Sequence, residues 1–459
     1  MSDGASKYDL TAGKIMPGLL RLSLPTMGVQ LIQMAYSFAS MFWLGRLSSG
    51  AVAASGTVGI LIWLSLTLQN YGRKGSEIGV SQCLGARNFP GARGYLQTSL
   101  SLALILGLIC GGGFLVFAGP LIGFFGIIDP RVENDAVIYL RVIACSIPFA
   151  YVNDSVAAAF NASGNSAKPF CINLVCLFMN SVLDPILIFA AGMGVTGAAV
   201  STVFCQILSC MVLLRALKNC RHEAFDGMKI WRLPRRAFVK SVFRWGTPGA
   251  AETFCFTFFV MIVSRLVAAF GSDAMAVQRI GNQVDQFSYL VSAGFAAALT
   301  AFIGQNFGAG QYERIWKGFV FGTLLMSVWG VAATLNLVFF NRFFFLLFVP
   351  GEPEVVSMGA RYLRIFALCQ FAACLEGVGQ SVFRGYGRTL YPSLISIFTN
   401  GLRVLLAYLL SGGSLAQDGI WWAISISAFL RGGLMYAFSL PYIYKIKKRH
   451  KKQKAKQQK

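Results

Sequence analysis

The chain has 459 residues, of which 56% are hydrophobic and only 13% are charged, and its mean hydropathy is +0.61. An ordinary soluble domain carries about 25% charged residues, so this composition excludes a water-soluble globular protein. The formal net charge of +22 would suit a nucleic-acid binder. The basic residues are segregated into alternate loops between apolar segments, however, and this pattern is typical of membrane proteins.

Apolar segments follow one another along the whole chain, and each can cross a hydrocarbon core of about 30 Å at about 1.5 Å per residue. Continuous apolar runs favour helices over the alternating pattern of a β-barrel. The predicted fold class is therefore all-α integral membrane, with twelve transmembrane helices. The predicted spans are 15–43, 51–80, 95–118, 133–158, 168–190, 194–217, 241–270, 274–302, 316–344, 355–380, 391–411 and 417–444.

The loops on one side of the predicted membrane contain nearly all of the lysine and arginine residues. Those on the other side contain only Arg46, Arg131 and Arg342, together with several acidic residues. This asymmetry predicts that both termini are cytoplasmic. The basic tail from about residue 445 is interpreted as a segment that touches anionic lipid headgroups, and nucleic acid is not expected as a partner.

The chain contains an internal repeat. Gln82-x-x-Gly85-Ala86 recurs as Gln305-x-x-Gly308-Ala309, an offset of 223 residues. The same offset pairs Arg21 with Arg244, Pro25 with Pro248, Tyr139-Leu140-Arg141 with Tyr362-Leu363-Arg364, and Phe160-x3-Gly164 with Phe383-x3-Gly387. In the last span of each half, Gly194 matches Gly419, a further shift of two residues.

Six spans per half is an even number, so both repeats enter the membrane in the same direction. We predict an N-terminal lobe at 1–222 and a C-terminal lobe at 223–459, joined by the polar segment 218–240. A central cavity between the lobes would open alternately to each face. The equivalent prolines Pro25 and Pro248 lie within the first span of each half, where they would produce either a static bend or a hinge.

Few residues are available for catalysis or metal binding. The eleven cysteines form no CxxC pair and are interpreted as core filling, and the only histidines are His222 and His450. The sequence holds no GxxxxGK[ST] loop for ATP. No metal centre or cofactor is expected, and the protein is interpreted as a secondary active transporter rather than an enzyme.

Three motifs together resemble the multidrug and toxic compound extrusion (MATE) family, over about residues 14–444. They are the paired QxxGA motifs, the segment Asn180-x3-Asp184-Pro185 leading into Gly192-Met193-Gly194-Val195, and Phe383-Arg384-Gly385-x-Gly387-x-Thr389. The resemblance implies a V-shaped twelve-helix fold and export of organic, cationic or amphiphilic small molecules against H⁺ or Na⁺. We expect a monomer in the cytoplasmic (inner) membrane. The alternative is a flippase for a lipid-linked sugar or other lipid of the same superfamily.

The resemblance also implies a cation site in the N-terminal half. Asn180, Asp184 and Thr202 match the family pattern, whereas Ser40 stands where an aspartate is expected in the first span. Ser40 and Asn153 complete the candidate set for cation or proton coupling. Asn180 and Asp184 are four residues apart and therefore share a helical face. A carboxylate beside an amide oxygen can hold a proton or Na⁺, although a purely structural aspartate remains the alternative.

The C-terminal half differs in its intramembrane polar groups. At the 223-residue offset, Glu376 is the repeat equivalent of Asn153, and Arg403 is the repeat equivalent of Asn180. Buried charges are costly in a membrane and are functional candidates. We hypothesise that Glu252, Glu376 and Arg403 meet near the cavity, where protonation would release Arg403 or a cationic substrate; the alternative is a static lattice of ion pairs. The candidate set in this half is Glu252, Asp285, Glu376, Arg403, Arg279 and Gln283.

A further charged group lies near the cytoplasmic end of the second span. It consists of Arg73, Lys74 and Glu77. We expect these long side chains to snorkel towards the lipid headgroups.

Overall fold

The computed structural model describes residues 9–127, 129–220, 225, 234–349, 351–413 and 415–457. Within these ranges every regular element is a helix. The elements of the first half are α1 (Ile15–Leu47), α2 (Ser49–Lys74), the π-helix η1 (Gly75–Val80), α3 (Ser81–Gly85), α4 (Phe89–Gly123), α5 (Pro130–Ala144), α6 (Ile147–Ala162), α7 (Ala167–Pro185), the π-helix η2 (Ile186–Ala190) and α8 (Gly194–Lys218). Those of the second half are α9 (Arg236–Ala268), α10 (Ser272–Gly308), α11 (Tyr312–Phe339), α12 (Asn341–Phe348), α13 (Pro353–Gly385), α14 (Leu390–Ser411) and α15 (Ala416–Gln457).

These helices confirm a multi-pass membrane protein. Eleven helices of the described chain are long and apolar enough to cross a membrane, and the bent pair α5 and α6 supplies a twelfth span. Two spans are composite, because α2 continues through η1 into α3, and α7 continues into η2. Each half therefore contributes six spans, as the repeat predicts.

Three features differ from the predicted spans. The span predicted at 133–158 is broken, with α5 and α6 meeting at an angle of 47°. Pro148 near the start of α6 explains the break, because proline lacks the N–H that would continue the helix from α5. The short helix α12 was not predicted, and α15 continues to Gln457, past the predicted end at 444.

The described helices also bear on the predicted linker and hinges. α8 ends at Lys218 and α9 begins at Arg236, while His222 and the predicted boundary at 222/223 lie outside the described residues. Pro25 and Pro248 lie inside α1 and α9, and both helices continue through the proline. A hinge at these prolines remains a prediction.

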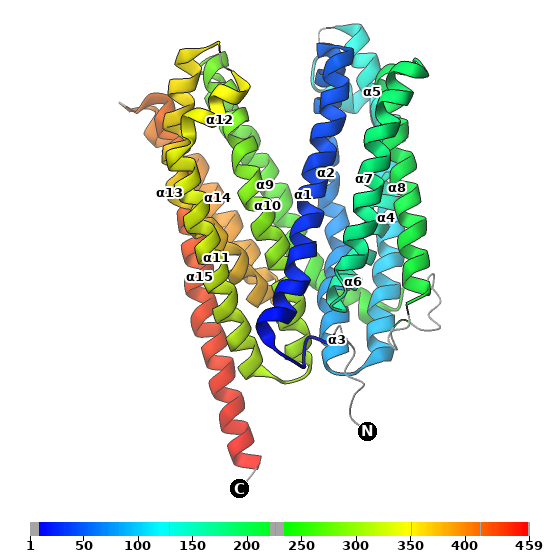
Figure 1. Ribbon diagram of the computed structural model, residues 1–459, viewed down its shortest axis with the longest axis vertical. Helices are drawn as coiled ribbons and strands as arrows, with labels where there is room; N and C mark the ends of the chain where they lie inside the picture. Colours follow the sequence, from blue (N-terminus) through cyan, green and yellow to red (C-terminus); the bar gives the residue numbers. More distant parts are fainter. Residues whose placement is uncertain are drawn as a thin grey trace.

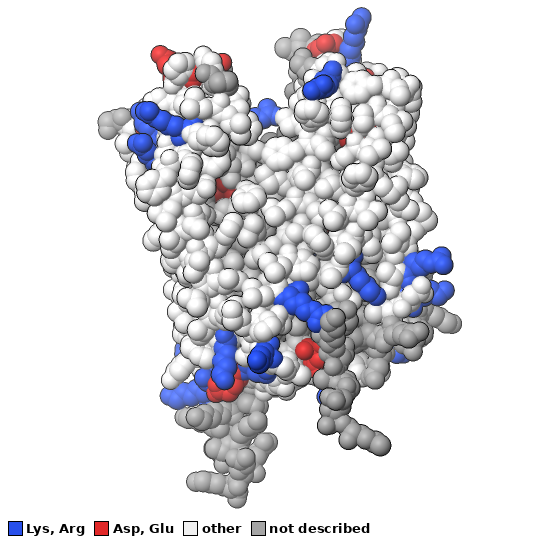
Figure 2. Space-filling model, in the orientation of Figure 1, with Lys and Arg blue, Asp and Glu red and all other residues white. Residues whose placement is uncertain are grey.

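The two halves form a V (Figure 1). Helices α1–α8 make one arm and α9–α15 the other, both chain ends lie at the joined end of the V, and the arms separate at the opposite end. We call these the terminus side and the open side. Figure 2 shows the surface hollowed between the tips of the lobes on the open side, and it shows many of the lysines and arginines on this face near the terminus side.

Each lobe has its own apolar core, but the cores merge at the terminus side. Residues of α4, α6 and α8 pack together in the N-terminal lobe, and residues of α10, α13 and α15 pack together in the C-terminal lobe. Leu19 and Leu22 of α1 are fully buried against Phe295 and Phe302 of α10. The first helix of one lobe therefore packs into the core of the other, and this packing closes the terminus side.

Candidate ion and substrate sites

The N-terminal lobe contains a buried carboxylate. Asp184 and Asn180 on α7 are both 0% exposed, and Asn180 Nδ2 donates to Asp184 Oδ1 at 3.2 Å. The Ser201 hydroxyl of α8 also donates to Asp184 Oδ1, and Asn180 Nδ2 lies 3.1 Å from Ser201 Oγ. Two helices thus position one carboxylate oxygen, and the π-helix η2 begins two residues after Asp184.

Three oxygens around this carboxylate have no hydrogen-bond partner. Among the described residues, Asp184 Oδ2, Asn180 Oδ1 and the Tyr36 hydroxyl of α1 are buried and unsatisfied. Tyr36 and Tyr139 both lie within electrostatic range of Asp184. Unsatisfied buried oxygens are costly, and an unpaired buried carboxylate more so. The arrangement is chemically suited to a proton or a small hard cation.

The other residues predicted for this site lie beside it rather than in it. Thr202 Oγ1 donates to the Ala198 carbonyl at 2.9 Å and lies near the Tyr36 hydroxyl, and Ser40 lies near Tyr139. The hydroxyl that reaches Asp184 belongs to Ser201, which the sequence reasoning missed. Ser201 and Thr202 are adjacent in sequence, and adjacent residues point about 100° apart around a helix. The motif therefore located the correct turn of α8 but identified the wrong one of the two hydroxyl groups.

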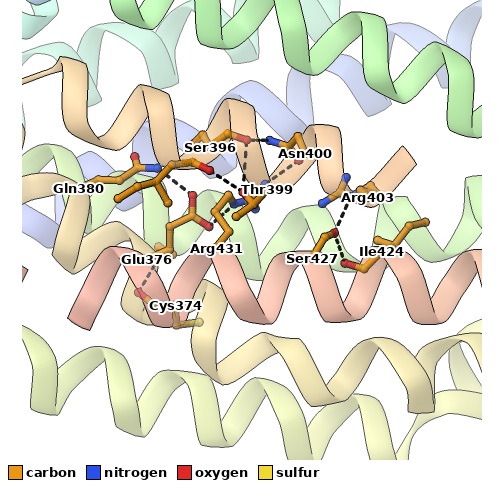
Figure 3. A network of polar contacts seen from close by, with 12 residues as sticks. Cys374, Glu376, Gln380, Ser396, Thr399, Asn400, Arg403, Ile424, Ser427 and Arg431 are labelled. Atoms are coloured by element: carbon orange, nitrogen blue, oxygen red, sulfur yellow. Dashed lines mark hydrogen bonds and ion pairs between the residues drawn. The ribbon is translucent and has the colours of Figure 1, made fainter. Parts of the chain in front are cut away.

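The C-terminal lobe contains a network of charged and amide side chains (Figure 3). Arg431 Nε on α15 donates to Glu376 Oε2 on α13 at 2.8 Å, and the two side chains are 14% and 9% exposed. Gln380 Nε2 donates to Glu376 Oε1 at 2.8 Å, and Arg431 Nη1 donates to Asn400 Oδ1 at 3.1 Å. Both oxygens of Glu376 are therefore occupied, and Arg431 joins α13 to α14.

The hypothesis that Glu252, Glu376 and Arg403 meet is wrong in its partners. Arg403 Nε donates to Ser427 Oγ at 2.9 Å, while Glu252 Oε2 accepts from Ser393 at 2.9 Å. The basic partner of Glu376 is Arg431, which the three-residue hypothesis did not include. The reason is geometric, because residue spacing does not show which side chains on different helices face one another.

The remaining candidates of this lobe form no hydrogen bond with that ion pair among the described residues. Asp285 on α10 accepts from Gln370 Nε2 and lies within electrostatic range of Arg403 and Arg431. Arg279 is exposed and Gln283 is half-buried, and no hydrogen bond of either side chain is found among the described residues. Asp285 therefore belongs to the charged region, whereas the role of Arg279 and Gln283 stays a prediction.

One side-chain contact occurs at equivalent positions in both lobes, but it is formed by neutral groups in one lobe and by charged groups in the other. In the N-terminal lobe, Asn153 Nδ2 donates to Gln206 Oε1 at 2.9 Å. Glu376 is the repeat equivalent of Asn153, and Arg431 is the equivalent of Gln206 once the two-residue shift before the last span is included. A neutral amide pair in one lobe is thus an ion pair in the other. Asn153 does not join the Asp184 cluster.

The charged group at the end of α2 does not snorkel. Lys74 Nζ donates to Glu77 Oε2 at 2.7 Å, and these residues are only 6% and 5% exposed. Arg73 is more accessible and lies 3.9 Å from Asp154 on α6. The expectation fails because this end of α2 is covered by the closed terminus side, so Lys74 neutralises Glu77 inside the protein.

The chain is similar to a known protein family, to individual relatives and to solved structures. The family model MatE matches residues 25–186 and 248–409, two stretches that begin 223 residues apart. The chain is 25% identical over 434 residues to "Probable multidrug resistance protein NorM" of Thermotoga maritima, covering 93% of this chain and 92% of the relative.

Two further similarities extend over nearly the whole chain. The "FAD transporter" of Shewanella oneidensis is 23% identical over 442 residues, covering 94% of this chain and 95% of the relative. The solved structure described as "Crystal structure of MATE in complex with MaD3S" superposes with a TM-score of 0.90 at 21% identity, covering 96% of this chain and 99% of that one.

Proposed function

The chain belongs to the MatE family, and on this premise we propose that it is a secondary active transporter that exports organic compounds by antiport against H⁺ or Na⁺. The observation that carries the proposal is the buried carboxylate of Asp184 with its unsatisfied neighbours. Such a group takes up a proton or cation from water more readily than it stays bare in a protein interior. No cofactor other than the coupling ion is required.

The proposed mechanism is alternating access between the two lobes. The lobes are separate on the open side and packed together on the terminus side. Parallel repeats of six helices can rock about such a contact and exchange which end is closed. Occupancy of the Asp184 site by H⁺ or Na⁺ would bias this equilibrium only if the ion binds one state more tightly than the other.

The charge distribution supports an orientation with both termini in the cytoplasm. Lysine and arginine dominate the loops of the terminus side, and cytoplasmic loops carry such an excess. We therefore place the open side at the outer face of the cytoplasmic (inner) membrane. The basic end of α15 would contact anionic headgroups, and one copy of the chain would suffice as the working unit.

The substrate class is proposed from the charged region of the C-terminal lobe. Among the described residues, the carboxylates of Glu252 and Asp285 accept hydrogen bonds from Ser393 and Gln370 rather than from lysine or arginine, so this region is suited to a cationic or amphiphilic compound. The name of the Shewanella relative denotes transport of FAD by that protein. A flippase for a lipid-linked sugar would require cationic groups in both lobes, whereas the Asp184 site has no hydrogen bond from lysine or arginine among its described contacts.

Transport from reconstituted vesicles tests the proposal. A fluorescent organic cation is loaded, and efflux is followed while a proton gradient and a sodium gradient are imposed separately. We expect one gradient to accelerate efflux of the dye several-fold. If neither gradient changes the rate for a panel of cationic dyes, cation antiport is contradicted, and transfer of a fluorescent lipid between leaflets in the same vesicles would identify the flippase.

A further inference from the structure

The lobes are joined on the terminus side by two hydrogen bonds that are copies of one another. Gln82 Nε2 on α3 donates to the Gly385 carbonyl at 2.8 Å, and Gln305 Nε2 on α10 donates to the Ala162 carbonyl at 2.6 Å. Both the donors and the acceptors differ by 223 residues, the offset of the repeat. Each bond therefore runs from one lobe to the other, in opposite senses.

The acceptors of these bonds are helix ends. Ala162 is the last residue of α6 and Gly385 is the last residue of α13. Carbonyls in the last turn of a helix have no partner within the helix and must be satisfied elsewhere. Each glutamine thus caps a helix of the opposite lobe, and the N-terminal-lobe acceptor Ala162 and its donor Gln305 are 0% and 3% exposed.

The glycines of the same motifs allow the helices to approach. A Cβ on Gly85 would lie 1.8 Å from the Gln305 carbonyl oxygen, and a Cβ on Gly308 would lie 2.0 Å from the Gln82 carbonyl oxygen. Each motif glycine therefore contacts the backbone of the other motif's glutamine. One contact between the two lobes explains the repeated QxxGA pattern. In each motif the glutamine donates a hydrogen bond to a helix end of the other lobe, and the glycine lets the two motif backbones approach closely.

Gln305 and its neighbours also bind the segment that precedes α1. Gln305 Oε1 accepts from the Leu10 backbone N–H at 3.0 Å, and Asn306 Nδ2 donates to the Leu10 carbonyl at 3.1 Å. Arg314 Nη1 donates to the Gly13 carbonyl at 2.9 Å. The segment before α1 is thereby bound to α10 and α11, so Gln305 fastens both α6 and the N-terminal segment of the opposite lobe.

We propose that Gln82 and Gln305 are a symmetric pair of latches that set the stability of the state closed on the terminus side. This inference rests on the alternating access proposed above. Opening the terminus side must break both hydrogen bonds and expose the carbonyls of Ala162 and Gly385 to water. Because Gln305 holds two partners, its latch contributes more to the closed state than that of Gln82.

Hydrogen–deuterium exchange of the full chain in lipid nanodiscs tests the latches without relying on transport. Gln82→Met, Gln305→Met and the double variant remove the donors while keeping an unbranched side chain of similar length. Gln311→Met is the matched control, since Gln311 lies on the same side and its buried Oε1 has no hydrogen-bond partner. Peptides covering residues 81–88 and 303–311 report on the terminus side, and those covering 44–52 and 268–275 report on the open side.

We expect the ratio of terminus-open to terminus-closed molecules to rise about fivefold for Gln82→Met, the equivalent of about 1 kcal/mol for one hydrogen bond at 25 °C. Gln305→Met should give a larger rise and the double variant the largest. Exchange should therefore increase on the terminus side and decrease on the open side, because alternating access couples the two ends.

Two results would overturn the latches: unchanged exchange on the terminus side in the double variant, or increased exchange on both sides, which indicates local loosening without a shift between states. If a methionine variant does not fold, Gly85→Ala compared with Gly18→Ala makes the same test. A Cβ at Gly18 meets nothing within 4 Å. If the exchange pattern is as expected but the protein transports no dye, the proposal that Gln82 and Gln305 are latches is supported and the proposed antiport is contradicted.

Discussion

Replacing Arg431 with glutamine removes the basic partner of a buried glutamate. Glu376 would keep its bond from Gln380, but its Oε2 would lose the guanidinium at 2.8 Å while remaining in a site where the side chain is only 9% exposed. Breaking a buried ion pair from one side leaves an uncompensated charge, which destabilises a protein by about 3–5 kcal/mol. We expect Arg431→Gln to lower the free energy of unfolding by this amount.

The N-terminal lobe shows how the loss can be reversed. Asn153 and Gln206 occupy the equivalent positions and form a neutral amide pair at 2.9 Å. Adding Glu376→Asn to Arg431→Gln recreates that pair in the C-terminal lobe and removes the unpaired charge. We expect the double variant to recover most of the lost stability, with a coupling energy of about 2–3 kcal/mol between the two sites.

The assay is equilibrium unfolding in mixed detergent micelles, followed by tryptophan fluorescence, for the four members of the cycle. Gln206→Ala in the N-terminal lobe is the control, and loss of this neutral hydrogen bond should cost about 0.5–1.5 kcal/mol. The reasoning fails if the double variant is as unstable as Arg431→Gln, because the contact would then not be interchangeable between the lobes.

Three further predictions concern single positions. Asp184→Asn should abolish the acceleration of efflux by the coupling ion while leaving the fold intact, which gradient-driven efflux and a melting curve measure together. Gly281→Ala should destabilise the C-terminal lobe by about 1–3 kcal/mol, because its Cβ would lie 2.0 Å from Cε1 of the buried Tyr362. Lys74→Gln should remove the cation that hydrogen-bonds to the buried Glu77 and cost about 1–3 kcal/mol in equilibrium unfolding, because Arg73 and Arg384 stay within electrostatic range of that carboxylate.

A matched control variant tests each of these three predictions. Ser201→Ala should weaken the ion response more than Thr202→Val, because only the Ser201 hydroxyl reaches Asp184. Gly59→Ala should be neutral or stabilising, since a Cβ there meets nothing within 4 Å and alanine favours helix. If Lys74→Gln and Lys74→Gln with Glu77→Gln are equally unstable, the buried charge is not the cause.

The sequence could predict the architecture because its signals are local or periodic. Apolar runs mark the spans, and the offset between Gln82 and Gln305 marks the repeat without knowledge of any contact. That offset, with the two-residue shift at Gly194 and Gly419, also relates Gln206 to Arg431. The equivalence was therefore present in the sequence, although only the structure shows that these residues contact Asn153 and Glu376.

The site was harder to predict because it depends on helix rotation and on packing between lobes. Ser201 rather than Thr202 reaches Asp184, a difference of one residue. Lys74 is buried where α9 of the other lobe and α4 of its own lobe pack around the end of α2, and no pattern within residues 73–77 encodes that packing. Short-range spacing places a group on a helix face, but it does not show which face the neighbouring helices cover.

Ion flux driven by the substrate tests the proposed antiport most directly. Vesicles that contain the purified protein and an internal pH or sodium indicator receive an organic cation on one side, with no ion gradient imposed. The account predicts that cation movement drives H⁺ or Na⁺ in the opposite direction, and that Asp184→Asn abolishes this flux. Substrate movement with no counterflow of either ion in the unmodified protein would contradict antiport.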